Sequence, residues 1–299
     1  MNTLPSLKDL RRLYAENVNI MGWFREVTGQ RENSTESILI SYDLQSGSYT
    51  RAADDPAYRA RHDRYADEIA AVLGGLGAAS VLEAGVGEAT TLVPVMQRLL
   101  PRPAVIAGFD ISWSRILFAR RYCAAHGPTH AQLCTGDLFA MPFVDDAFDV
   151  VFTAHAIEPN HGREREALLE LYRVARRWVV LFEPSYELGG EATRQRVEEH
   201  GYCRGLPAIA QELGWKIAEH RLLANPMRDN NQTAVLVIEK PTASPSAPVV
   251  GLGCPLCHRP LESIRGNYFC EDCARIFPVI DDIPCLLPGN GILGSKFKD

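Results

Sequence analysis

The sequence predicts an α/β protein with a doubly wound, mostly parallel sheet, a terminal antiparallel strand pair and a small cysteine-rich domain behind it. Three observations support this prediction. Short apolar runs alternate with longer amphipathic runs, two strand-like runs near residue 240 are separated only by a short polar turn, and four cysteines form two C-x-x-C pairs near the C-terminus. Strands that alternate with helices indicate βαβ units and a parallel sheet covered on both faces.

The strand and helix predictions follow the chain in order. Four apolar runs have strand length, and three segments between them have helical spacing. The last two runs are joined by the turn 227–231 and predict an antiparallel pair. The strand-length runs are 80–85, 105–110, 148–154 and 178–184, the helical segments are 90–100, 112–127 and 163–177, and the final pair is 215–226 and 232–240.

Composition and charge restrict the class of protein. The 299 residues are 46% hydrophobic and 23% charged, which is typical of a chain that buries a sizeable core. A net charge of −6 disfavours nucleic acid as a partner, although a local basic patch is not excluded. No apolar run approaches the roughly 20 residues of a membrane span, and the N-terminus lacks a secretory pattern. We therefore expect no membrane partner, a cytoplasmic location, and cysteines that are reduced or bind metal.

A composition break divides the chain. The segment 241–249 is rich in Pro, Ser and Ala and reads as a linker. Before it we expect a helical and irregular N-terminal flap region over residues 1–60 and the main α/β domain over 61–240. After it, residues 250–299 form the small cysteine-rich domain.

The most informative segment joins the first predicted strand to a helix. The strand ends in Glu83, and Gly85 and Gly87 follow immediately. Glycines allow a tight turn and a close backbone approach to a ligand, and a helix N-terminus adds a favourable electrostatic end. The same pattern opens dinucleotide-binding domains and also occurs in turns that bind nothing.

Two aspartates end the next strands. Asp110 follows the second strand, where a carboxylate can accept hydrogen bonds from both hydroxyls of an adenosine ribose. Asp137 follows a further strand, counted as the third, which we expect between the runs 105–110 and 148–154; there it can receive an adenine amino group. Each has a structural alternative: Asp110 can act with Ser112 as a helix N-cap, and Asp137 can be a turn residue.

Glu83 discriminates between two adenosine-containing cofactors. A carboxylate ahead of the glycines favours a positively charged amino group and repels a pyrophosphate. S-adenosylmethionine carries an ammonium and a sulfonium, whereas NAD carries a diphosphate. The charge therefore favours S-adenosylmethionine.

These residues form an ordered set that resembles the class I S-adenosylmethionine-dependent methyltransferases, which have a Rossmann-like fold. The set comprises Glu83-x-Gly85-x-Gly87-x-Ala89, Asp110, Gly136-Asp137 and the run from Pro142 to Val151. The terminal antiparallel pair is similar to the reversed seventh strand of that fold. Ala89 stands where many members carry a third glycine. The resemblance covers roughly Ser80 to Lys240.

The resemblance implies roles for the matching residues. Glu83 would orient the methionine amino group, while Gly85 and Gly87 would line the methionine and ribose. Asp110 would hold the ribose and Asp137 the adenine. Three further residues are counted with this cofactor site, with ordinary core packing as the alternative for the tyrosine: Ile111, Leu138 and, from the N-terminal flap, Tyr42.

The acceptor site is expected in the loops after the fourth and fifth strands, at the carboxyl edge of the sheet. We expect His155 or His161 to act as a base or acceptor ligand, and Glu158 or Glu183 to bind a polar or cationic acceptor. The alternative for each is that it caps a helix or a strand end. Asn160 and Tyr186 lie in the same loops.

The four cysteines near the C-terminus predict a metal site. Cys254, Cys257, Cys270 and Cys273 form two knuckles that can fold onto one tetrahedral zinc ion. Two disulfides or idle thiols are the alternative. The run resembles the zinc-ribbon family of methyltransferase activators, with a similar tail over 277–284 in which Phe277 replaces the usual tyrosine and Asp282 the usual glycine. The resemblance implies a helper domain fused in cis, and four cysteines leave zinc no open position for catalysis.

The combined prediction is an S-adenosylmethionine-dependent methyltransferase with bound zinc, acting on an N or O nucleophile of a small molecule or sugar derivative. The rival within this class is an RNA or translation-factor methyltransferase. Outside it, the alternatives are a non-catalytic Rossmann-like module that binds a partner, and an NAD-dependent oxidoreductase. The sequence leaves the acceptor and the oligomeric state open.

Overall fold

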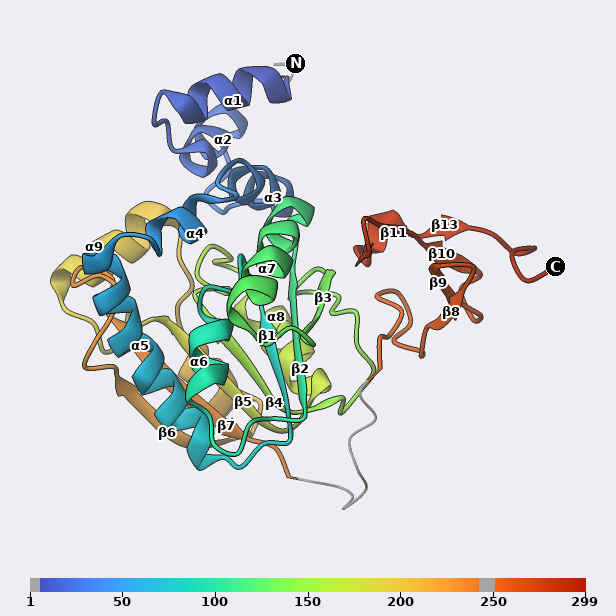
Figure 1. The fold of residues 1–299 in the computed structure, drawn as a ribbon. Helices are drawn as coiled ribbons and strands as arrows, with labels where there is room; N and C mark the ends of the chain where they lie inside the picture. The colour runs from blue at the N-terminus through green and yellow to red at the C-terminus, as the bar shows by residue number, and fades with distance from the viewer. Residues whose placement is uncertain (1–5, 242–250) are drawn as a thin grey trace.

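The computed structural model describes residues 6–241 and 251–299, so the predicted linker 241–249 lies almost entirely outside the described residues. A seven-stranded sheet with the order β3-β2-β1-β4-β5-β7-β6 forms the centre of the main domain (Figure 1). Its strands are β1 (Ser80–Ala84), β2 (Val105–Asp110), β3 (Gln132–Thr135), β4 (Phe148–Ala154), β5 (Ala175–Pro184), β6 (Lys216–Leu222) and β7 (Thr233–Glu239).

The sheet confirms the predicted fold class. Strands β1 to β5 pair in parallel, whereas β7 is antiparallel to both β5 and β6. One boundary differs from the sequence prediction: the helical pattern expected over 163–177 changes to strand at Ala175. The reason is tertiary, because Ala175 pairs with Phe148 of β4.

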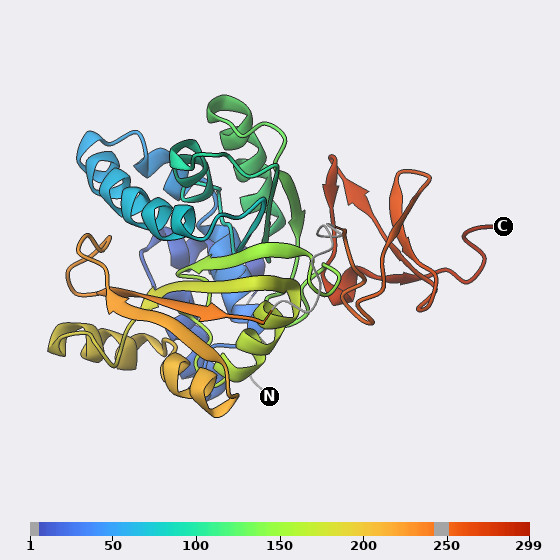
Figure 2. The same cartoon turned by 90° about the horizontal axis from the view of Figure 1, so that it is seen from below.

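Helices cover both faces of the sheet, as Figure 2 shows. Neighbouring strand residues point to opposite faces, so Val81 packs under α5, α6 and α7, while Leu82 packs against α8 and α10. Residues 61–75 of α5, and the whole of α9 and α10, were not predicted as helix. The helices of the domain are α5 (Pro56–Gly75), α6 (Leu92–Arg98), α7 (Trp113–His126), α8 (Glu164–Val174), α9 (Glu191–His200) and α10 (Leu206–Glu212).

The N-terminal section is helical. Leu10, Ile20 and Phe24 form a small separate core between its first helices. Side chains of α3 and α4 reach the carboxyl ends of the parallel strands, where the ligand site of such a sheet is expected. The helices are α1 (Leu7–Ala15), α2 (Ile20–Thr28), α3 (Thr35–Leu44) and α4 (Ser48–Ala52).

The C-terminal unit packs against the β3 edge of the sheet (Figures 1 and 2). Thr135 of β3 forms a parallel bridge with Cys285, and its Oγ1 accepts a hydrogen bond from the Leu286 amide at 3.0 Å. A Cβ on Gly253 would lie 2.6 Å from the backbone of Phe143, so this close approach requires glycine. The strands are β8 (Glu262–Ile264), β9 (Asn267–Cys270), β10 (Arg275–Phe277), β11 (Val279–Ile280), β12 (Ile283–Pro284) and β13 (Ile292–Leu293), with a 3₁₀ turn at Pro288–Asn290.

None of the helices in the described ranges is long and apolar enough to span a membrane.

Candidate functional site

A cavity of about 750 Å³ lies at the carboxyl ends of the parallel strands. The turns after β1, β2, β3 and β4 form its floor. Side chains from α3, α4, α5, α9 and the β6–β7 loop, residues 223–232, complete its wall. The predicted cofactor residues Glu83, Gly85, Gly87, Asp110, Ile111, Asp137, Leu138 and Tyr42 all line this cavity.

The glycine turn needs its glycines. Gly85 has φ +73°, and a Cβ there would lie 2.4 Å from the Cβ of Ala156. Gly87 has φ +55°, in the left-handed region that favours glycine. Ala89 has φ +59° and is buried. The turn therefore presents backbone rather than side chains to the cavity.

Glu83 is a buried carboxylate with unused hydrogen-bonding capacity. Its side chain is 1% exposed, and Oε2 has no hydrogen-bond partner within the described part of the chain. Burial, together with the charge of Asp110, raises the pKa of Glu83 well above its usual value. Buried polar atoms normally have partners, so an unpartnered oxygen on a cavity wall marks a place where a ligand donor fits.

Asp110 links the end of β2 to the glycine turn. Its Oδ2 accepts a hydrogen bond from the Gly87 amide at 3.0 Å, and Oδ1 accepts one from the Ser112 amide at 2.9 Å. Burial raises the pKa of Asp110 against the opposing charge of Arg115. The N-cap of α7 is Ser112, whose hydroxyl accepts from the Arg115 amide. Asp110 therefore supports the start of α7 and still faces the cavity.

The position of Asp137 is compatible with both roles considered for it, the turn residue and the cofactor ligand. Its Oδ1 accepts a hydrogen bond from the Phe139 amide at 2.9 Å, as a turn residue does. The residue also lines the cavity beside Leu138 and Phe139. The turn fixes the carboxylate at the cavity wall.

A cation between two tyrosines closes the cavity on the side of the N-terminal helices. The guanidinium of Arg115 lies 4.9 Å from the ring centre of Tyr42 and 4.8 Å from that of Tyr49. Arg115 is 8% exposed, and its Nε has no partner among the described residues. Arg115 was not predicted, because its contacts come from helices distant in the sequence.

Glu88, also missed, joins the N-terminal section to the glycine turn. Its carboxylate accepts hydrogen bonds from the backbone amides of Gly47 at 2.9 Å and Thr50 at 2.8 Å. These amides open α4, and an acidic group is favourable at a helix N-terminus. Two features of the sequence could have indicated this contact: the acidic Glu88 within the glycine turn, and Gly47 directly ahead of the short helix α4.

His155 and Glu158 form a side-chain pair just after β4. Nδ1 of His155 contacts Oε2 of Glu158, and Nε2 lies 3.1 Å from Oγ1 of Thr233. Burial alone would lower the pKa of His155, but the Glu158 carboxylate outweighs it and the pKa is raised. Burial likewise opposes the ionised form of Glu158, but His155 lowers its pKa. His155 has φ +61°, an uncommon conformation for a non-glycine residue that places the ring on the cavity wall.

The structure does not bring His161 or Glu183 into the cavity lining. Nδ1 of His161 lies 2.8 Å from Oε1 of Glu164. Glu183 instead caps the loop after β4, because its carboxylate accepts hydrogen bonds from the amides of Ala156, Ile157 and Glu158, each at 3.0 Å. Burial raises the pKa of Glu183 to about 7. Its position matches the structural alternative considered for it.

Three further arginines that line the cavity were not predicted. Arg61 comes from α5, Arg196 from α9 and Arg228 from the β6–β7 loop, and all three line the cavity. The sequence offered no local signal, since each lies far along the chain from the glycine turn and from the others.

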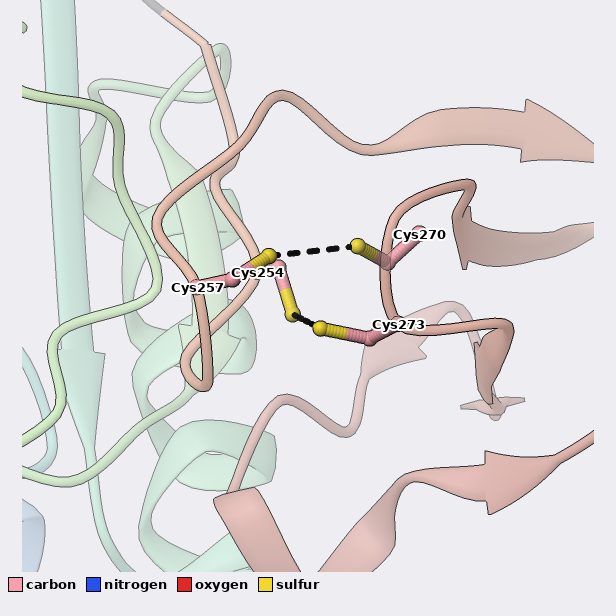
Figure 3. Close-up of side chains that lie close together, drawn as sticks. All are labelled: Cys254, Cys257, Cys270 and Cys273. Carbon is pink, nitrogen blue, oxygen red and sulfur yellow. Dashed lines mark hydrogen bonds between the residues drawn. The ribbon is translucent and has the colours of Figure 1, made fainter.

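The four cysteines of the C-terminal unit meet as predicted (Figure 3). All four sulfur atoms lie within 4.8 Å of one another. The Sγ atoms of Cys257 and Cys270 are 3.5 Å apart, and those of Cys254 and Cys273 are 4.0 Å apart. Four thiolates at about 2.3 Å from a tetrahedral zinc ion would be roughly 3.8 Å from one another. The donor set therefore fits a structural zinc ion.

Comparisons with known proteins agree with this architecture. Residues 81–177 match a family model described as a methyltransferase domain. Magnesium protoporphyrin IX methyltransferase from Synechocystis PCC 6803, solved with bound S-adenosylhomocysteine, is 17% identical with a TM-score of 0.52, covering 68% of this chain and 99% of that one. At this identity the likeness shows the fold.

Two further solved structures are similar at lower TM-scores. A putative methyltransferase from Bacillus halodurans C-125 is 16% identical, with a TM-score of 0.44, and the match covers 55% of this chain and 93% of that chain. The complex of the Haloferax volcanii Trm112 methyltransferase activator with a putative methyltransferase gives 16% identity and a TM-score of 0.49, covering 66% of this chain and 97% of the matched one.

The matched domain spans β1 through the start of β5 and includes the glycine turn and both aspartates. It favours the predicted enzyme over a non-catalytic module. The chain therefore carries a methyltransferase domain on a Rossmann-like sheet, which supports the predicted enzyme.

Proposed function

We propose that the chain transfers a methyl group from S-adenosylmethionine to an N or O nucleophile of a small molecule, such as a sugar derivative. The observation that carries this proposal is the unpartnered carboxylate oxygen of Glu83 in a cavity formed at the strand ends. A buried carboxylate without a partner is costly, and the ammonium group of the cofactor would offset that cost.

Residues at the ends of different strands would bind different parts of the cofactor. Glu83 would bind the amino group, and the backbone of Gly85 and Gly87 allows close approach beside it. Asp110 would bind the ribose hydroxyls and Asp137 the adenine. When bound, S-adenosylmethionine supplies an electrophilic methyl group on sulfur. The apolar contacts around it would come from Ile111, Leu138 and Tyr42.

His155 is the base that the geometry favours. Its ring lines the cavity and is oriented on both nitrogens, by Glu158 and by Thr233. A neutral His155 that carries its proton on Nδ1, toward Glu158, can accept at Nε2 the proton that an N–H or O–H acceptor loses, in place of its contact with Thr233. Glu158 stabilises the resulting imidazolium. Because His161 is outside the cavity lining, we assign it no role in catalysis.

The cavity favours a small acceptor over RNA or a protein. Helices α3, α4 and α5 contribute to its wall, and its volume of about 750 Å³ lies in the roughly 300–1,000 Å³ range of small-molecule sites. The net charge of −6 agrees with this choice.

We also propose that residues 250–299 are a zinc ribbon that stabilises its neighbour in cis. Their four thiols fit one zinc ion, and a domain of this size buries too little surface to fold easily alone. Thiolate ligands suit a reducing compartment, which supports a cytoplasmic location. The proposed division of the remaining chain is a flap over 1–60 and a methyltransferase domain over 61–240.

Calorimetric titration with S-adenosylhomocysteine tests the cofactor assignment, with NAD titrated as the comparison. We expect saturable binding of S-adenosylhomocysteine at one site per chain and none of NAD. Binding of NAD alone would overturn the proposal. Screening small N- and O-nucleophiles with isotopically labelled S-adenosylmethionine would then identify the acceptor.

A further inference from the structure

The cavity is divided by charge. Its carboxylates include Glu83 in β1, Asp110 at the end of β2 and Asp137 after β3, where the proposed function places the cofactor. Three of its guanidinium groups, Arg61, Arg196 and Arg228, come from α5, α9 and the β6–β7 loop, whereas Arg115 of α7 lies beside Gly87. The ammonium and sulfonium of the cofactor account for the carboxylates, and Arg115 is available for its single carboxylate, which leaves Arg61, Arg196 and Arg228 without a role.

Arg196 has unused donors. Its Nε is buried without a hydrogen-bond partner among the described residues, while one terminal nitrogen donates to the Tyr202 hydroxyl at 3.4 Å. The guanidinium lies 5.7 Å from the centre of the same ring. No carboxylate within the described ranges pairs with it at 4.0 Å or less. Tyr202 therefore orients the Arg196 guanidinium, and its Nε–H remains available to a ligand.

Arg228, in the β6–β7 loop, lines the same cavity. Its positive charge acts on His155 and on Tyr58, where it opposes the larger effects that raise the pKa of each group. Its guanidinium makes no hydrogen bond or ion pair with the residues that the structure describes. Arg61 differs, because it donates to the Met227 carbonyl at 3.2 Å and so supports the loop that carries Arg228.

The carboxylate of Glu158, which also lines the cavity, already has partners. Glu158 pairs with His155 and also receives the Asn231 amide at 3.4 Å. Arg196 acts on Glu158 and Arg228 acts on His155, so both guanidinium groups face the two members of one pair. Since the His155–Glu158 pair has no net charge when both members are ionised, the arginines leave this end of the cavity positive.

We propose, building on the proposed function, that the methyl acceptor carries an oxyanion group, carboxylate or phosphate, which Arg196 and Arg228 bind. Guanidinium forks match the planar oxygens of such groups and bind them through paired hydrogen bonds. The oxyanion is the group by which the acceptor is held. The nucleophile is a separate N or O atom of the acceptor, and binding of the oxyanion orients this atom toward His155.

The test uses the full chain saturated with S-adenosylhomocysteine and titrated at fixed ionic strength. The probes are inorganic phosphate and benzoate, with benzamide as the uncharged match of benzoate and choline as a cation. We expect saturable binding of phosphate, benzoate or both, and none of benzamide or choline. The oxyanion that binds identifies the source of the charge.

The variants R196Q and R228Q should each weaken binding of the responding anion roughly tenfold, since a hydrogen bond to a charged group is worth about 1.5 kcal/mol or more. Arg221, an exposed residue of β6 outside the cavity lining, gives the control variant R221Q, which should bind the anion as the parent does. Affinity for S-adenosylhomocysteine should be unchanged in all three.

Two results would overturn the assignment alone: S-adenosylhomocysteine binds while neither anion does, or both glutamine variants bind the anion as tightly as the parent. The comparison of benzoate with benzamide on the parent decides the question even if a variant fails to fold. A parent chain that binds no S-adenosylhomocysteine would overturn the proposed function together with this inference.

Discussion

The carboxylate of Glu88 accepts a hydrogen bond from the Gly47 amide at 2.9 Å, which joins the glycine turn after β1 to the start of α4. The amide of Thr50 binds the second oxygen of the same carboxylate at 2.8 Å. The wall that α3 and α4 contribute to the cavity is therefore tied to the turn that forms its floor.

Replacing Glu88 should loosen that wall. We expect Glu88→Ala to lower the free energy of unfolding by about 1–3 kcal/mol, because it leaves helix-opening amides without their acceptor. Hydrogen exchange should accelerate at residues 47–50. Glu32→Ala, an exposed change elsewhere in the N-terminal section, is the control. Unchanged exchange at 47–50 in the Glu88 variant would show that this contact does not hold α4.

Glu83→Gln should separate stability from cofactor affinity. Burial raises the pKa of Glu83 in the free protein, so the neutral amide should be tolerated and the variant should unfold at or above the parent temperature. Its affinity for S-adenosylhomocysteine should fall at least about tenfold, since the charge opposite the ammonium is lost. Equal affinity in calorimetry would contradict the assigned role.

The same raised pKa predicts a proton signal on binding. An ammonium beside Glu83 favours the ionised carboxylate, so its pKa falls in the complex and a proton is released where the free protein is still protonated. The observed binding enthalpy should therefore change with the ionisation enthalpy of the buffer in the parent, and less so in Glu83→Gln. An identical buffer dependence in both proteins would exclude Glu83 as the source.

The His155–Glu158 pair predicts a titration that needs no acceptor. Nuclear magnetic resonance of labelled histidines should give His155 a pKa above 6.5, because Glu158 stabilises the imidazolium. In Glu158→Gln the pKa should fall, since burial remains and the stabilising charge is gone. A catalytic rate that depends on neutral His155 would then rise with pH through a lower pKa in the variant. A pKa that Glu158→Gln leaves unchanged would refute the coupling.

The cysteine cluster predicts one zinc ion per chain by elemental analysis. Cys257→Ser should reduce the zinc content and expose residues 251–299 to proteolysis, because metal binding and folding are coupled in such small units. Cys123→Ala, which removes a buried thiol of α7 outside the cluster, should retain its zinc. A parent chain free of zinc after purification without chelators would contradict the site.

The sequence predicted the parts of the site that are local in the chain. Glu83, Asp110 and Asp137 were predicted because parallel strands bring their carboxyl ends to one edge of the sheet. A polar residue at the end of each strand is therefore expected at the ligand site. The two cysteine pairs were found for a similar reason, since each knuckle is a local feature.

The rest of the site depends on contacts that no local pattern reports. Arg115, Arg196 and Arg228 reach the cavity only because α7, α9 and the β6–β7 loop meet there, and α9 was not predicted at all. His155 and His161 were equivalent in the sequence. Backbone geometry separates them, since a positive φ places His155 on the cavity wall while His161 turns to Glu164.

The bridge between Thr135 and Cys285 has a consequence for solubility. Strand β3 is the outermost strand of the sheet, and the C-terminal unit covers its free side through this bridge and the packing around Leu286. Uncovered edge strands with apolar neighbours pair with other molecules and promote aggregation. A chain truncated after residue 241 would expose that edge and is expected to self-associate more readily than the full chain.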